Sequence, residues 1–137
     1  MKPGTWGSIF LIYWYGLLCT AEAGKMPPLV NDLEHALGIP PTQLGLCVSA
    51  VVAVPALAGV LAGSFMEGVV GLRRGLALSA LIICFANIGE IFATGFASML
   101  SLRLFEGFGF VGLLVGSPAL IIRTAEGKRR VQAMAGW

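Results

Sequence analysis

Four long apolar runs, separated by short polar segments, dominate the sequence. They cover residues 6–24, 44–65, 76–96 and 99–122. Each has close to the 20 or so residues that a helix needs to cross the hydrocarbon core of a bilayer. A further apolar stretch begins at 131, a few residues before Trp137. The pattern predicts one domain over 1–137, with four spanning helices and the start of a fifth. We expect the chain to be a fragment of a longer protein.

Composition also indicates a membrane protein. Of the 137 residues, 57% are hydrophobic and only 12% are charged, whereas about 25% of residues in soluble domains are charged. A soluble protein of this size could not cover its surface with so little polarity. The net charge of +2 is small, and no basic run is interleaved with aromatic residues, so nucleic acid is not an expected partner. We predict an all-α integral membrane fold, a multi-helix transmembrane bundle in contact with the lipid bilayer.

Basic residues predict the orientation of the bundle. Lys2 precedes the first run, and Arg73 and Arg74 separate the second from the third. Four more follow the fourth run: Arg123, Lys128, Arg129 and Arg130. Because cytoplasmic loops carry an excess of Lys and Arg, the amino terminus and the loops at 66–75 and 123–130 are predicted to be cytoplasmic. The expected location is the plasma (cell) membrane, with several passes.

Three charged residues lie inside the third and fourth apolar runs, where a charge costs roughly 2.5 to 3.5 kcal/mol and usually has a partner. Glu90 is in the third run, and Arg103 and Glu106 are one helical turn apart in the fourth. A short turn near 97–98 would make a hairpin of these runs and place Glu90 and Arg103 at similar depth, about 10 Å below its outer end. Two acids and one base can relay a proton or a substrate, because the second acid can hold a proton. They can equally form a structural ion pair that fixes helix register.

Another charged pair lies near the outer end of the first run. Glu22 and Lys25 are three residues apart, so they share one face of a helix. Two interpretations stay open: an interfacial pair whose long side chains reach the headgroups, and a gate or anion-binding contact.

Other kinds of site are not indicated. Cys19, Cys47 and Cys84 fall in three different runs without metal or redox spacing, which favours small buried hydrophobes. The sequence has no cluster of His, Cys and Asp, no Ser–His pair and no phosphate-binding loop. We therefore expect no metal, no cofactor and no enzymatic activity.

Two segments resemble motifs of the major facilitator superfamily (MFS). Residues 103–109 read Arg-Leu-Phe-Glu-Gly-Phe-Gly and are similar to the family's fourth-helix pattern Arg-x-x-Gln-Gly-x-Gly, with Glu106 in place of Gln. Residues 63–74 resemble the family's loop between helices two and three, Gly-x-Leu-Ala-Asp-Arg-x-Gly-Arg-Arg, with Gly68 in place of the first Arg and one residue inserted. The related positions are Gly63, Glu67, Gly71, Arg73 and Arg74. The basic stretch 126–134 is similar to the loop that leads into helix five.

This resemblance implies the amino-terminal part of a twelve-helix fold, built from two six-helix halves around a midplane site. It implies a secondary, alternating-access transporter of a small solute, a symporter or an antiporter. Glu67 with Arg73 or Arg74 would form a cytoplasmic gate that pairs in one state. The missing carboxyl-terminal helices would be partners, and Lys25 with Arg103 would make an anionic substrate attractive.

Two further functions stay open at this point. One is a complete four-helix transporter that works as a dimer. The other is a four-helix membrane subunit, or an assembly and docking protein, without transport activity of its own.

Overall fold

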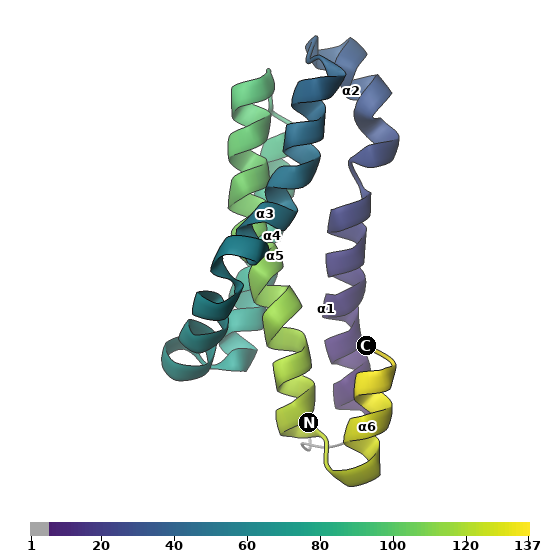
Figure 1. Cartoon of the computed structure of the whole chain (residues 1–137), viewed down its shortest axis with the longest axis vertical. Coiled ribbons are helices and arrows are strands. Elements are labelled where there is room, and N and C mark those ends of the chain that lie inside the picture. Colours follow the sequence, from purple (N-terminus) through teal and green to yellow (C-terminus); the bar gives the residue numbers. More distant parts are fainter. Residues whose placement is uncertain (1–5) are drawn as a thin grey trace.

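The computed structural model of the chain describes residues 6–137 (Figure 1). Within that range the chain consists of helices and short connections, without a β-strand. The elements are α1 (Trp6–Gly24), the 3-10 helix η1 (Pro27–Leu29), α2 (Val30–Leu37), α3 (Pro41–Phe65), the π-helical turn η2 (Met66–Val70), α4 (Leu72–Glu90), α5 (Phe96–Thr124) and α6 (Gly127–Ala135). The predicted all-α architecture is confirmed.

Three helical segments among the described residues are long and apolar enough to cross a membrane: Pro41–Val70, Leu72–Glu90 and Phe96–Thr124. They correspond to the second, third and fourth apolar runs. Many of their apolar side chains point outward, and Leu57 and Val60 of α3 are each 86% exposed, as expected where lipid or further helices cover the surface. The integral membrane fold is thus confirmed. Helix α1 coincides with the first run, but it is not one of these three segments, so its crossing stays a prediction.

The two ends of the bundle differ in their charge. In Figure 1, α6 and the start of α1 lie at one end and α2 lies at the other. The turn between α3 and α4, which is followed by Arg73 and Arg74, also lies in the half that contains α6. The basic segments therefore lie toward one end of the bundle, as the predicted orientation requires. Lys2 lies outside the described residues, and the assignment of this end to the cytoplasm stays a prediction.

The turn between α4 and α5 comes earlier than predicted. It takes residues 91–95 in place of 97–98, since α4 ends at Glu90 and α5 begins at Phe96. Ser98 fixes this boundary, because its hydroxyl accepts hydrogen bonds from the backbone N–H groups of Thr94 and Gly95 at 3.1 and 3.2 Å and so caps the start of α5. Glu90 is therefore the last residue of α4. It lies closer to the turn between α4 and α5 than the sequence suggested.

Helix α6 occupies the place where a fifth run was expected to begin. It starts at Gly127, which has a φ of 53°, earlier than the predicted residue 131, and it turns back along α1 (Figure 1). The Tyr13 hydroxyl of α1 donates a hydrogen bond to the carbonyl of Ala133 at 2.8 Å. The described part of this segment is thus a short helix docked on α1.

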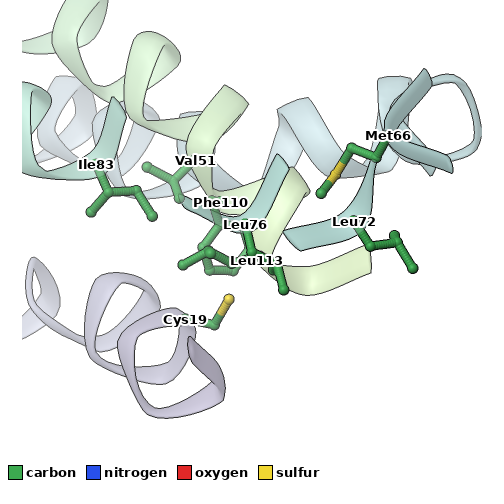
Figure 2. Packing of buried hydrophobic residues seen from close by; sticks show 8 residues of the cluster. All are labelled: Cys19, Val51, Met66, Leu72, Leu76, Ile83, Phe110 and Leu113. Carbon is green, nitrogen blue, oxygen red and sulfur yellow. The ribbon is translucent and has the colours of Figure 1, made fainter. Parts of the chain in front are cut away.

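Helix α5 is the centre of the bundle. It packs along α3 and α4 and also contacts α1. The central core between these helices is apolar (Figure 2) and consists of Cys19, Val51, Met66, Leu72, Leu76, Ile83, Phe110 and Leu113. A second group, here called the α2-end cluster, consists of Met26, Cys47, Ala93 and Met99. The buried environments of Cys19 and Cys47 match the prediction for the cysteines, whereas Cys84 is exposed on α4.

Candidate functional site

Five charged side chains and one amide meet between α1, α4 and α5. This charged cluster consists of Glu22, Lys25, Asn87, Glu90, Arg103 and Glu106. Sequence reasoning treated Glu22 and Lys25 as a separate pair, but the structure places them in one network with the three charges of the third and fourth runs. Glu22 is only 7% exposed. Glu22 and Lys25 are therefore part of a larger network, and their role as an interfacial pair or as a gate stays a prediction.

Arg103 is the fully buried cation of the cluster. One guanidinium nitrogen, Nη1, lies 2.6 Å from Oε2 of Glu106 and 3.4 Å from Oε1 of Glu90. Its Nε donates a hydrogen bond of 3.3 Å to the backbone carbonyl of Cys47 on α3. A buried guanidinium is tolerated only when its donors find partners. Arg103 thus ties α3, α4 and α5 together, and Glu90, predicted to lie at similar depth, is within ion-pair distance of it.

Lys25 is the second cation, and it follows the last residue of α1. Its Nζ lies 2.8 Å from Glu22 Oε2, 3.0 Å from Glu90 Oε2 and 3.0 Å from Glu106 Oε1. It also donates to Oδ1 of Asn87. Burial disfavours the charged ammonium, but the surrounding carboxylates outweigh this effect and raise the pKa of Lys25 above its ordinary value. Lys25 is therefore a permanent positive charge in this arrangement.

Asn87 is a member of the cluster that sequence reasoning missed. Its Nδ2 donates hydrogen bonds of 2.9 Å to Glu22 Oε1 and 2.9 Å to the carbonyl of Ile83. It lies three residues before Glu90 and hence on the same face of α4. An amide one turn from an acid in an apolar run is the signal that would have found it.

Apolar residues flank the charged cluster on two sides. Cys19 and Phe110 of the central core lie about one turn from Glu22 and Glu106 along their helices. On the other side are two residues of the α2-end cluster: Met26, which directly follows Lys25, and Met99, which lies four residues before Arg103. Low polarity strengthens each interaction between the charges. When every group is ionised, the three carboxylates exceed the two cations by one negative charge.

The Glu90–Arg103 contact can be measured by a double-mutant cycle. We expect a coupling free energy of about 0.5 to 3 kcal/mol between Glu90→Gln and Arg103→Met, because the two side chains touch in a buried site. Unfolding of the chain in mixed micelles with increasing SDS supplies the four free energies. Glu67→Gln with Arg103→Met is the matched control and should be additive. Additivity for Glu90 as well would show that it does not interact with Arg103.

The predicted gate residues lie at the opposite end of α5. Glu67 in η2 pairs with Arg123 of α5, at 3.5 Å between Oε1 and Nη2, and both side chains are about half exposed. The structure does not show the predicted pairing of Glu67 with Arg73 or Arg74. Both arginines are exposed at the start of α4, and Arg73 borders a cavity of about 360 Å³ between α1, α4 and α5.

Two glycines of the same motif have separate structural reasons. Gly71 has a φ of 82°, which favours glycine, and it ends η2 directly before α4. A Cβ at Gly63 would lie 3.1 Å from Val115 of α5. These positions therefore set the geometry of the turn and its distance from α5, next to the Glu67–Arg123 pair.

Comparison with known protein families identifies the class. A sequence profile described as Major Facilitator Superfamily matches residues 11–137, a range that includes the whole charged cluster and the 63–74 segment. No curated protein and no solved structure showed significant similarity. The resemblance found in the two motifs is confirmed, and proteins of this family are membrane transporters and not enzymes. The chain therefore belongs to the major facilitator superfamily.

Proposed function

We propose that the chain supplies the amino-terminal helices of a secondary transporter, a symporter or antiporter that moves a small solute by alternating access. The observation that carries this proposal is the charged cluster, in which buried charges from α1, α4 and α5 meet. Charges inside a membrane bundle are expensive and typically mark pathways for substrates, ions or protons. Transporters of this family place their site between two six-helix halves. The exposed apolar faces of α1 and α3 would then contact the remaining helices or lipid.

Glu106 is the proposed proton carrier of the cluster. Each of its oxygens lies within ion-pair distance of a cation, Oε2 of Arg103 and Oε1 of Lys25. Glu90 contacts the same two cations, whereas Glu22 contacts Lys25. With three carboxylates against two cations, one proton neutralises the cluster without removing a cation. This balance supports a proton or another cation as the transported or coupled ion, in place of the anion that Lys25 and Arg103 alone suggested.

The Glu67–Arg123 pair is proposed as one position of the cytoplasmic gate. An exposed ion pair contributes only about 0 to 1 kcal/mol, so it can break during a conformational cycle at small cost. Arg73 and Arg74 are alternative partners for Glu67 in another state.

The replacement of Glu106 by Gln tests the proposed relay. Uptake of labelled small organic cations and carboxylates is measured one by one in cells that express the transporter. Uptake of the solute that it transports should depend on pH. Glu106→Gln should remove most of that dependence, because the amide keeps the size of the side chain but cannot exchange a proton. Glu67→Gln is the control, and it should leave the pH profile unchanged since Glu67 lies outside the cluster.

The outcomes separate the alternatives. An unchanged pH profile in Glu106→Gln would reject Glu106 as the proton carrier while leaving transport itself intact. If no member of the panel is taken up by the unmodified protein, the proposal of transport by this protein fails for those solute classes. A docking subunit without transport activity would then become the better interpretation.

A further inference from the structure

The ammonium of Lys25 occupies a cage of four oxygen atoms. They belong to Glu22, Asn87, Glu90 and Glu106, and the three carboxylate oxygens lie 2.8 to 3.0 Å from Nζ. Helix α1 supplies one oxygen, α4 supplies two and α5 supplies one. None comes from the connection that carries Lys25. The cage is thus a feature of the packed helices, and Lys25 fills it from the connection that follows α1.

Lys25 is the member of the cluster that can leave most easily. Its side chain is 23% exposed, against 9% for Glu22, 14% for Glu90 and none for Glu106. Lys25 and Met26 lie between α1 and η1 and belong to neither helix. A movement of this connection would withdraw the ammonium without displacing α1, α4 or α5.

Withdrawal of Lys25 would leave the cage strongly anionic. Three carboxylates would face Arg103 alone, with two negative charges in excess among apolar neighbours. A buried charge without a partner is costly, so the vacated cage would favour the entry of another cation. The acceptors suit an N–H donor, because an ammonium group presents hydrogens that carboxylate and amide oxygens accept.

We propose that this cage is a binding site for a primary ammonium group, and that Lys25 is its tethered occupant, which a free ammonium ion can replace. The inference deepens the proposed function and rests on it, because it names the chemical class that the charged cluster would take as substrate or coupling ion. Lys25 would then act as a competitor that holds the site closed until a cation displaces it.

Methylammonium is the probe for this site. The thermal unfolding midpoint of the purified chain with Lys25→Ala is measured in detergent and an amine-free buffer, with methylammonium, sodium or tetramethylammonium chloride at equal concentration. Methylammonium should raise the midpoint by roughly 3 to 6 °C at tenfold above its dissociation constant. Tetramethylammonium, which has no N–H donor, and sodium should not reproduce this rise.

Matched variants locate the response. The unmodified chain should respond much less, because Lys25 already fills the cage. Lys128→Ala, which removes an exposed lysine of α6, should behave like the unmodified chain. Adding Glu22→Gln to Lys25→Ala should reduce the methylammonium response, because it replaces one of the three carboxylates with a neutral amide.

The opposite results would overturn the inference. If methylammonium does not raise the unfolding midpoint of Lys25→Ala, the ammonium site is rejected. If all three salts raise the midpoint equally, the rise is an effect of ionic strength, and the site is rejected as well. If Lys25→Ala does not fold, recovery of folded protein on refolding with methylammonium supports the site, and no recovery rejects it. If methylammonium does not stabilise Lys25→Ala while uptake by the transporter remains pH-dependent, this inference fails and the proposed function stands. Ammonium binding without uptake would instead reject the proposed transport.

Discussion

Arg103→Met should lower the free energy of unfolding of the chain by about 3 to 5 kcal/mol, because it leaves buried carboxylates without their main partner. The Arg103 side chain is 1% exposed, and that of Glu106, 2.6 Å away, is completely buried. Met keeps the apolar stem of the side chain but carries no charge and supplies no donor to Glu106, Glu90 or the Cys47 carbonyl. Titration of the micelle-bound chain with SDS measures the difference.

Arg123→Met is the matched control for this prediction. It removes the same type of side chain from the same helix, but its pair with Glu67 is exposed and longer, at 3.5 Å. Its effect should therefore lie within about 1 kcal/mol of zero. Addition of Glu106→Gln to Arg103→Met should restore part of the lost stability, since it neutralises the buried carboxylate that has lost Arg103. Equal effects of the two arginine replacements would show that burial of Arg103 does not govern its contribution.

The sequence was sufficient to predict the helices and part of the charged cluster. The apolar runs located α1, α3, α4 and α5 because a spanning helix needs a length of apolar sequence that few other elements share. Glu90, Arg103 and Glu106 could be associated because hairpin geometry and helical spacing depend on the local sequence alone. The family followed from the residues around Arg103 and from the 63–74 segment, and the sequence profile confirmed it.

The remaining contacts depend on tertiary packing. Lys25 and Glu22 join the cluster because α1 packs on α5, and nothing in the spacing of either helix specifies that approach. The turn at 91–95 was missed because Ser98 caps α5 from inside an apolar stretch. Arg123 became the partner of Glu67 because the end of α5 lies beside η2, whereas sequence proximity pointed to Arg73 and Arg74.

Gly109→Ala should destabilise the chain by about 1 to 3 kcal/mol, because the added methyl group would overfill the contact between α5 and α4. Its Cβ would lie 2.7 Å from the backbone carbonyl oxygen of Ser79 and 2.7 Å from Cγ1 of Ile83. Ile83 can change its rotamer, but the Ser79 carbonyl belongs to the backbone of α4. The helices would have to separate to admit the methyl group. SDS titration of the micelle-bound variant gives the free energy.

Gly59→Ala shows whether the contact or the glycine itself is responsible. A Cβ at Gly59 has no neighbour within 4 Å among the described residues, and Ala is favoured over Gly inside a helix by about 0.5 to 1 kcal/mol. Gly59→Ala should therefore be neutral or stabilising, opposite in sign to Gly109→Ala. Matching signs would contradict the assignment of Gly109 to a close helix contact. Because α4 also carries Asn87 and Glu90, separation of α4 from α5 in Gly109→Ala should weaken the Glu90–Arg103 coupling. Packing at this glycine and the geometry of the charged cluster would then be linked through one helix.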